Sequence, residues 1–421
     1  MTVALDQRDR ARLAGEEGPA LALAMKLVVR AAEIMAAPRL IEISFAHLDA
    51  CFYAGEAHVD FARFLHQHSA RFAVTTWTNN GLVSLAQPDL RPEIADPERV
   101  CGARALMTLY AGLGAKPTWT CAPYQLPGGP RFGDHIAVGE SNAVAYYNSV
   151  LGARTNKYGD YLDAACALIG KAPEAGLHTD GGRRAGLRFR LSGIGQDWLA
   201  EDVFYHLIGH HAGRISGRRI PLIEGLAPEA SADNLKALSS AVAASGGVEL
   251  WHGAGVTPEA MAPDAMWGGG PEYEVTPADL RAARDVLSSG RDGPLDMVAL
   301  GTPHFSAREF QSLLSLLDGR KVKPGLPVLV STSRFVRAAA GAEIAALEAL
   351  GVSVVTDVCT YYSPAVRGAR GRVMTNAAKW AYYAPGMLGV EVCFGALREC
   401  VESAVRGEVW RDAKLWRGIG A

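Results

Sequence analysis

The sequence of 421 residues lacks the features that mark several large classes of protein. It has no excess charge of either sign, since 42 Lys and Arg accompany 44 Asp and Glu, so no global field attracts nucleic acid or membranes. No apolar run reaches the roughly 20 residues of a membrane span, and the charged N-terminal stretch is unlike a secretory signal. The seven cysteines include no CxxC pair, which disfavours a zinc ribbon or thioredoxin-like site. We expect a cytoplasmic protein with reduced thiols.

The composition is that of an ordinary globular protein, with 49% hydrophobic and 20% charged residues. The length predicts two or three domains of about 150 residues each. A segment rich in Gly and Pro at 261–277 is the clearest boundary, and a weaker boundary lies at 176–186. The sequence therefore predicts three α/β regions, at 1–185, 186–270 and 271–421.

Short β-rich runs alternate with helical patterns along the chain. Strands are predicted at 39–48, 71–77, 117–122, 186–192, 247–253, 295–302, 326–332 and 351–360. Helices are predicted at 8–35, 93–113, 198–211, 231–245, 276–289, 306–318, 335–350 and 394–406. Ser306 with Glu309 forms a capping-box pattern, and Thr276 before Pro277 marks another helix start. The alternation predicts α/β layers with mostly parallel sheets, in which ligands bind beyond the carboxyl ends of the strands.

Polar clusters lie at the ends of several predicted strands. They are found at 75–79, 121–124, 301–304, 331–334 and 357–359. One such cluster alone is most often an ordinary loop, but five with side chains that bind anions or metals favour a shared site. Arg334, in one of these clusters, is a candidate to stabilise negative charge. Arg154, which lies elsewhere, is the strongest candidate to hold a carboxylate, because a guanidinium forms two parallel hydrogen bonds with it.

The segment 133–183 is dense in hydrogen-bonding side chains within an apolar context. Buried polar groups are costly unless they are paired, so this density predicts a binding site or a tight structural network. An interpretation as helix caps and a polar turn stays open. The candidate substrate-binding residues in this segment are Ser141, Asn142, Asn148, Ser149, Thr155 and Asn156.

A series of ordered motifs makes the sequence resemble the large, catalytic part of aconitase X. These motifs are AHLDACFY, VTTWTNN, CAPYQLPGGPRFGDHIAVGESNAV, NSVLGARTNKYGDYLD, VELWHGAGVTPEA, GTPHFS, TSR, DVCTYYSP and TNAAKWAYYAPG. The resemblance spans essentially the whole chain. It implies an aconitase-like arrangement of α/β domains around a central cleft. It also implies an iron–sulfur lyase that dehydrates a small hydroxy acid, either cis-3-hydroxy-L-proline or mevalonate 5-phosphate.

The resemblance implies cluster cysteines in the CAPY, GCPH and DTC motifs of the archaeal relatives. The first corresponds to Cys121 and the last to Cys359, but the middle position holds Thr302, whose hydroxyl is a poor iron ligand compared with a thiolate. This departure favours a [2Fe–2S] cluster or another iron or metal arrangement, with Cys393 as a candidate further ligand. The remaining cysteines are predicted to be core thiols: Cys51, Cys101, Cys166 and Cys400.

A dehydratase must help a hydroxyl to leave, accept the proton α to the carboxylate, and stabilise the negative charge that develops. The candidate catalytic residues are Lys379, Arg154 and His304. Ser333, Arg334 and Tyr382 are further candidates for substrate binding. The leading hypothesis is dehydration of cis-3-hydroxy-L-proline to pyrroline-2-carboxylate, because no glycine-rich phosphate loop is present. A dehydratase of mevalonate 5-phosphate is the alternative.

The resemblance also implies a small swivelling domain that carries a catalytic serine, and no such domain follows the last motif. We therefore expect a separate small subunit that completes the active site and excludes water. The alternative is that Lys379 or a tyrosine of this chain is the base. A non-catalytic binding or regulatory relative is a further alternative, although the near-neutral charge disfavours a nucleic-acid partner.

Overall fold

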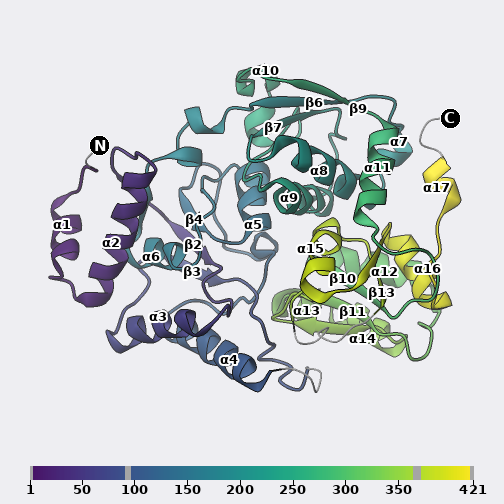
Figure 1. The fold of residues 1–421 in the computed structure, drawn as a ribbon, viewed down its shortest axis with the longest axis horizontal. Helices are drawn as coiled ribbons and strands as arrows, with labels where there is room; N and C mark the ends of the chain where they lie inside the picture. Colours follow the sequence, from purple (N-terminus) through teal and green to yellow (C-terminus); the bar gives the residue numbers. More distant parts are fainter. Residues whose placement is uncertain (1–2, 91–95, 364–370, 418–421) are drawn as a thin grey trace.

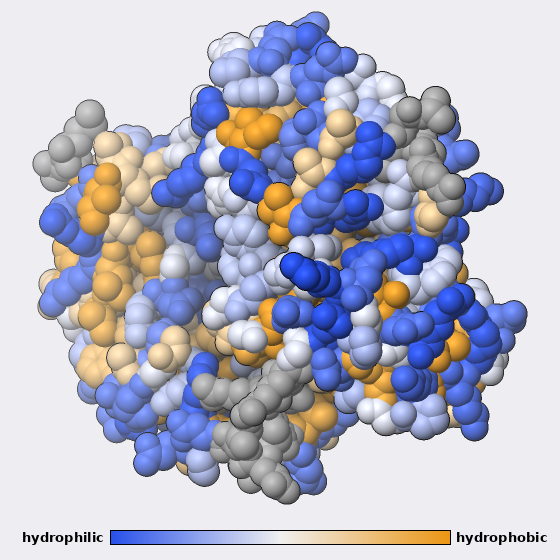
Figure 2. All heavy atoms as spheres, turned by 45° about the vertical axis from the view of Figure 1, so that its right-hand side comes forward, coloured by the Kyte–Doolittle hydropathy of each residue, from blue (hydrophilic) through white to orange (hydrophobic). Residues whose placement is uncertain are grey.

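The structure is a computed structural model that describes residues 3–90, 96–363 and 371–417. The fold is α/β with mostly parallel sheets, as predicted, and its elements form three units (Figure 1). Polar and charged residues are spread over the face shown in Figure 2, and hydrophobic residues there form separate patches. Within the described ranges, the helices are too short or too polar to cross a membrane.

The first unit, in purple and blue in Figure 1, contains a three-stranded parallel sheet with β2 at its centre. The strands are β1 Leu40–Glu42, β2 Phe45–Leu48, β3 Thr75–Thr78, β4 Ile136–Val138 and β5 Lys171–Pro173. The helices are α1 Gln7–Ala14, α2 Pro19–Ile34, α3 Glu56–Gln67, α4 Pro97–Gly112, α5 Ser141–Tyr146 and α6 Leu162–Ile169. A π-helical turn at Tyr147–Leu151 continues α5. The sheet order is β3-β2-β4, and β1 pairs with β5 antiparallel.

The second unit contains a four-stranded parallel sheet of order β8-β7-β6-β9. Its strands are β6 Leu187–Leu191, β7 Pro221–Glu224, β8 His252–Gly253 and β9 Glu272–Val275. Its helices are α7 Gln196–Leu199, α8 Asp202–Ser216, α9 Ala232–Gly246, α10 Pro263–Met266 and α11 Pro277–Leu287. The two long helices α8 and α9 pack against each other and lie beside the sheet (Figure 1).

The third unit contains a five-stranded parallel sheet of order β12-β11-β10-β13-β14. Its strands are β10 Met297–Phe305, β11 Val328–Thr332, β12 Ser353–Thr356, β13 Arg372–Thr375 and β14 Glu391–Phe394. Its helices are α12 Ala307–Leu317, α13 Arg334–Ala339, α14 Gly341–Ala349, α15 Ala378–Leu388, α16 Leu397–Arg406 and α17 Ala413–Arg417. The green and yellow elements of Figure 1 show this unit beside the second one.

Local signals place some helix ends correctly and miss others. Helices α11 and α12 start after Thr276 and Ser306, as predicted, and both starts are capping boxes, of which only the one at Ser306 was predicted. The single predicted helix at 8–35 is wrong, because α1 ends at Gly15 in the left-handed conformation, with φ +90°, and α2 starts separately. For the predicted helix at 93–113, residues 93–95 lie outside the described residues.

Two predicted strands also differ from the structure. The run 39–48 divides into β1 and β2, which belong to different sheets. The predicted strand at 117–122 is wrong, because Trp119 has φ +43°, which breaks an extended run. The irregular backbone that replaces this strand brings Cys121 to the cavity described below.

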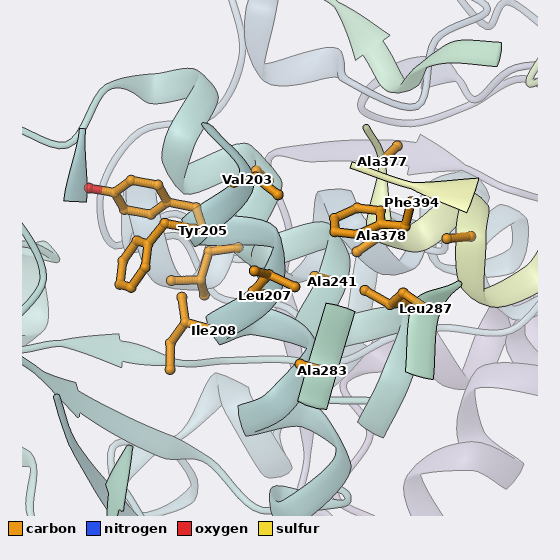
Figure 3. Packing of buried hydrophobic residues seen from close by; sticks show 14 of the residues in the cluster. Val203, Tyr205, Leu207, Ile208, Ala241, Ala283, Leu287, Ala377, Ala378 and Phe394 are labelled. Carbon is orange, nitrogen blue, oxygen red and sulfur yellow. The ribbon is translucent and has the colours of Figure 1, made fainter. Parts of the chain in front are cut away.

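One hydrophobic cluster joins the second and third units. Val203 and Leu207 on α8 and Ala241 on α9 pack with Ala378 of α15 and Phe394 of β14 (Figure 3). Burying a large apolar side chain contributes about 1.5–3 kcal/mol. The cluster therefore holds α15 firmly against α8 and α9.

A buried tryptophan links α15 to the loop after β12. Trp380 is fully buried, and its indole N–H donates to Thr360 Oγ1 at 3.0 Å. Lys379 on α15 and Cys359 in the loop are the sequence neighbours of these two residues. The contact therefore fixes Lys379 and Cys359 relative to each other.

Candidate active site

The strands of the first sheet end at one edge and present polar side chains to a common cavity. Asp49 follows β2, Asn79 and Asn80 follow β3, and Glu140 follows β4. Gly139 permits this close approach, because a Cβ atom there would lie 2.7 Å from Asp49 Cβ. Ligand sites in parallel sheets lie beyond such strand ends.

The third sheet reaches the same cavity through β10 and the loop after β12. Thr302 lies on β10 and Cys359 lies in that loop. The register of the pairing between β10 and β11 shifts next to Gly301. Gly301 has φ +86°, and a Cβ atom at this position would lie only 2.2 Å from Ser331 O of β11. This irregularity lets Thr302 line the cavity while the rest of β10 stays in the sheet.

The cavity between the two sheets has a volume of about 260 Å³. This is below the roughly 300–1,000 Å³ of ordinary ligand pockets, so the cavity suits a small molecule. A second cavity of about 420 Å³ lies among α8, α9, α12 and α16 but contains no cysteine. The smaller cavity combines thiols, carboxylates and amines, and it is the candidate active site. Its lining residues are Asp49, Phe52, Asn79, Asn80, Cys121, Glu140, Ser141, Lys157, Thr302, Cys359, Tyr361, Tyr362, Lys379, Tyr383 and Met387.

Lys379 and Glu140 form a buried ion pair in the cavity wall. Lys379 Nζ contacts Glu140 Oε1 and also donates to Ser141 Oγ at 3.2 Å. Burial disfavours the charge on Lys379, but the Glu140 carboxylate outweighs burial and holds the pKa of the Lys379 amine well above its ordinary value. Lys379 is therefore a cation at neutral pH. It can stabilise developing negative charge, but it is not poised to accept a proton.

Glu140 is held in place by groups from α5. Its Oε2 accepts hydrogen bonds from Asn142 Nδ2 at 2.8 Å and from the Ala143 amide at 2.7 Å. Burial favours the neutral acid, but Lys379 and these donors together hold the pKa of Glu140 below its ordinary value. Asn142, predicted to bind substrate, does not line the cavity and instead orients Glu140. Tyr124 OH donates to Asn142 Oδ1 at 2.7 Å.

Two buried thiols, Cys121 and Cys359, line the cavity. Burial raises the pKa of the Cys359 thiol to about 11, and burial together with the neighbouring Cys359 raises the pKa of Cys121 well above its usual value. Thr302 Oγ1 lies 3.3 Å from Cys359 Sγ, and the His304 amide donates to Cys121 Sγ at 3.4 Å. Without a metal the thiols are therefore neutral, and metal binding must release their protons.

The two thiols fit two ligand positions of an iron–sulfur cluster. The third expected position holds the Thr302 hydroxyl. His304 does not substitute for it, because its Nδ1 lies 3.0 Å from Thr120 Oγ1 and its Nε2 lies 2.9 Å from Val358 O. In the described ranges, no group of three or more His, Cys, Asp or Glu residues is arranged to hold a metal ion.

His304, predicted to be catalytic, is fully buried and does not line the cavity. Burial lowers the pKa of its imidazole to about 4, so the ring is neutral. Both ring nitrogens contact neighbouring loops, as given above. The structure therefore places His304 as a support for the backbone around Cys121.

Cys393, predicted as a further cluster ligand, lies away from the cavity. It is on β14, at the edge of the third sheet, where it packs in a hydrophobic cluster with Cys400 and Val401 of α16. Its Sγ lies 3.7 Å from Arg291 O. The strand pairing of β14 with β13 keeps this thiol in the core.

The two arginines predicted for the site, Arg154 and Arg334, bind residues of the protein itself. Arg154 pairs with Asp180 at 2.6 Å and donates to His178 O at 3.2 Å. Arg334 forms two hydrogen bonds with the fully buried Asp357, at 2.7 and 2.6 Å. Neither arginine lines the cavity. Ser333, next to Arg334, accepts from the Val336 amide as the cap of α13.

The other polar residues predicted after α5 form an internal network that does not line the cavity. Asn148 donates to Thr155 O at 2.8 Å and to Glu249 O at 2.9 Å. Ser149 Oγ accepts from the Trp251 amide at 2.9 Å. Asn156 likewise accepts from the Leu177 amide and donates to Ala175 O. Asn148 and Ser149 thereby join the first unit to the second, whereas Asn156 ties together segments of the first unit.

Sequence reasoning missed several residues of the cavity. Tyr382 was predicted, but it is 45% exposed and its neighbour Tyr383 lines the cavity instead. Asp49 and Asn80 were not predicted, and Asn79 was included only within the polar cluster at 75–79, although all three lie just after strands. The rule that ligands bind at strand ends was the signal that would have found them.

Family models match three parts of the chain. They are described as the Aconitase X first domain at residues 2–181, the second domain at 187–285 and the third domain at 295–406. The predicted resemblance to aconitase X is confirmed by these matches.

Relatives with known names support the same assignment. A cis-3-hydroxy-L-proline dehydratase of Pseudomonas aeruginosa is 41% identical over 98% of this chain and 72% of its own length. A phosphomevalonate dehydratase large subunit of Thermococcus kodakarensis is 33% identical over 90% of this chain and 94% of its own length. A crystal structure of Thermococcus kodakaraensis aconitase X in its holo form superposes with a TM-score of 0.85 at 31% identity, covering 96% of this chain and 100% of the other. This chain is therefore a member of the aconitase X family of hydro-lyases.

Proposed function

We propose that the chain catalyses the dehydration of cis-3-hydroxy-L-proline to pyrroline-2-carboxylate. The observation that carries this proposal is its 41% identity, over 98% of the chain, to a relative named for that substrate. The small volume of the cavity, about 260 Å³, supports a substrate of this size. The reaction removes the α-proton and the β-hydroxyl of the substrate as water.

We propose that Lys379 stabilises the negative charge that develops on the substrate carboxylate as the α-proton leaves. Glu140 supports this role, because it keeps the Lys379 amine charged and fixes its position. Ser141 contacts the same amine and lines the cavity, so it is the predicted substrate-binding residue we retain. Fixed charges of this kind act strongly in a site that excludes water.

We further propose that Cys121 and Cys359 are two ligands of an iron–sulfur cluster of the [2Fe–2S] type. When bound, such a cluster supplies a Lewis acid that helps the hydroxyl leave. The proposal is supported by the position of both thiols in the wall of one cavity. The hydroxyl of Thr302 beside Cys359, in place of a third thiol, supports a cluster with few cysteine ligands.

A small subunit or domain is proposed to complete the cavity and to supply the group that accepts the α-proton. The phosphomevalonate relative is named a large subunit, and the match covers 94% of it. The match to the hydroxyproline relative covers 72% of that protein, which therefore has residues beyond it. Closing the cavity in this way would exclude water. The free state of all seven cysteines supports our proposal of a cytoplasmic enzyme.

The second candidate is dehydration of mevalonate 5-phosphate. The near-complete coverage of the phosphomevalonate large subunit favours it. Its lower identity, 33% against 41%, places it second.

An assay with both substrates tests the proposal. The chain is loaded with iron and sulfide under anaerobic conditions, alone and with the part of the Pseudomonas aeruginosa relative that lies outside the match. We expect pyrroline-2-carboxylate from cis-3-hydroxy-L-proline, at a higher rate in the completed enzyme. Turnover of mevalonate 5-phosphate alone would establish the second candidate, and turnover of neither substrate by the completed enzyme would overturn both.

A further inference from the structure

The cavity contains two charged side chains that have no ion-pair partner among the residues that the structure describes. They are Asp49 and Lys157, and both line the cavity. The other charged residues there, Lys379 and Glu140, are paired with each other. The cavity therefore offers one free negative and one free positive group, and a ligand that satisfies both must carry both charges.

Asp49 is held rigidly although its charge is unpaired. Its backbone amide donates to Asp163 Oδ2 at 2.6 Å, and its Oδ1 accepts from Asn79 Nδ2 at 2.5 Å. Within the described part of the chain, its second carboxylate oxygen has no hydrogen-bond donor. A carboxylate fixed in this way is preorganised for a cationic ligand.

Two asparagine amide groups beside Asp49 also lack partners. Asn79 and Asn80 are 3% and 1% exposed, and both line the cavity. The acceptor Asn79 Oδ1 and the donor Asn80 Nδ2 have no hydrogen-bond partner in the described structure. Buried polar groups are nearly always paired, so these two amide groups are available to a bound water or ligand beside Asp49.

These groups match the two ends of a cyclic amino acid. A ring nitrogen of the proline type is positively charged and carries N–H donors, and the free carboxylate oxygen of Asp49 provides an acceptor. A carboxylate takes a cation, which Lys157 provides. A phosphorylated hydroxy acid has no cationic group for Asp49, and its phosphate would be repelled by that carboxylate.

We infer that Asp49 binds the positively charged ring nitrogen of the substrate, that Lys157 binds its carboxylate, and that this pair selects a cyclic amino acid. Asn79 is a positioning residue, since it orients the Asp49 carboxylate. The inference rests on the proposed function and assigns its substrate specificity to residues of this chain.

Binding of two unreactive ligands tests the inference. L-proline carries the ring ammonium and the carboxylate, whereas tetrahydrofuran-2-carboxylate has a ring oxygen in place of the nitrogen. Their dissociation constants are measured by calorimetry with the completed, iron-loaded enzyme. The wild-type enzyme should bind L-proline at least about tenfold more tightly, because a charge-assisted hydrogen bond is lost with the oxygen ring.

Two variants should give different patterns. Asp49→Asn should weaken L-proline binding by about 10- to 100-fold but should not weaken tetrahydrofuran-2-carboxylate binding, because the ring oxygen offers no N–H to Asp49. Lys157→Met should weaken both ligands by a similar factor, because both carry the carboxylate. Asp49→Ser removes the same carboxylate charge with a different side chain and should give the same pattern as Asp49→Asn. Asp285→Asn is the matched control, since Asp285 pairs with Arg284 at 2.6 Å outside the cavity and should not affect the preference.

The outcomes separate this inference from the proposed function. An undiminished preference for L-proline in both Asp49 variants, or no preference in the wild-type enzyme, would overturn the inference even if cis-3-hydroxy-L-proline is turned over. A fall in kcat with unchanged L-proline binding would also overturn it, because Asp49 would then act in proton transfer. Conversely, a preference for L-proline that depends on Asp49, without turnover of cis-3-hydroxy-L-proline, would support the inference and reject the proposed function.

Discussion

Lys379 and Glu140 lie 239 positions apart in the sequence and form an ion pair in which both side chains are buried. Lys379 lies in the first turn of α15, and Glu140 caps the start of α5. The pair therefore joins the third unit to the first across the cavity. The geometry of the pair depends on the hydrophobic cluster that packs α15 against α8 and α9. The position of the Lys379 cation in the cavity therefore depends on contacts among all three units.

The first prediction separates the structural role of this pair from its catalytic role. Lys379→Met leaves Glu140 as an unpaired buried charge, and the free energy of unfolding should fall by about 3 kcal/mol. The variant Lys379→Met with Glu140→Gln removes both charges and should recover much of this stability. Neither variant should turn over substrate, because the cation is missing. Urea unfolding and initial rates measure the two effects.

A pair outside the cavity provides the control for this prediction. Lys171 contacts Asp9 at 2.8 Å, and neither residue lines the cavity. Lys171→Met should lower stability and keep the turnover rate of the folded enzyme. Normal turnover by the double variant at Lys379 and Glu140 would show that the charge of Lys379 is not needed.

The second prediction concerns the thiols. Cys121→Ser and Cys359→Ser should each lose most of the bound iron and sulfide, since a serine hydroxyl is a weak ligand for iron. Cys393→Ser should keep the wild-type content, because that thiol is packed in the core of the third unit. Chemical analysis of anaerobically purified protein gives the iron and sulfide content. Equal loss in all three variants would indicate general unfolding and contradict the assignment.

The third prediction is that Thr302 limits the size of the cluster. Thr302 Oγ1 lies 3.3 Å from Cys359 Sγ, so Thr302→Cys places a third thiol beside the existing two. Three thiolates are suited to a larger cluster, and the iron content should rise from about two toward about four per chain. Iron analysis and the visible absorption spectrum report the change, with Thr302→Ser as the matched control. An unchanged iron content in Thr302→Cys would show that other residues set the cluster size.

Strand-end patterns and family motifs identified much of the fold and part of the cavity. The α/β class follows from the alternation of strands and helices, which is a local property of the sequence. Cys121, Cys359 and Lys379 were proposed from motifs and Ser141 from the dense polar segment at 133–183, and the structure places all four around one cavity. Motifs succeed here because they mark backbone positions at strand ends and helix starts.

The polar residues after α5 show that the sequence does not reveal which groups a polar side chain will bind in the folded protein. Asn148 is satisfied by Arg183 and Glu249, which lie 35 and 101 positions away. A dense polar segment looks the same whether its partners are distant residues or a ligand. Asp49 shows the reverse case, since a single carboxylate after a strand resembles a loop residue until its lack of a cationic partner is seen in three dimensions.

The last prediction concerns the stability of the enzyme in acid. His178 is 3% exposed, its Nδ1 lies 2.9 Å from His135 Nδ1, and its Nε2 lies 2.7 Å from Tyr158 OH. Burial, and then the neighbouring His135, lower the pKa of His178 from 6.5 to about 3. Between these two values the unfolded chain binds a proton that the folded chain does not bind. Stability therefore falls as the pH decreases through this window.

At pH 5 this one residue should lower the free energy of unfolding by about 2 kcal/mol relative to pH 7.5. His178→Gln keeps a hydrogen-bonding side chain but does not titrate, so it should lose stability at pH 7.5 and recover relative to the wild type at pH 5. The comparison isolates His178 from groups such as Glu309, whose pKa burial raises to about 7 and whose effect on stability has the opposite sign. Urea unfolding of both proteins at the two pH values measures the difference. If the wild-type and variant stabilities change in parallel, His178 does not have the depressed pKa on which this prediction rests.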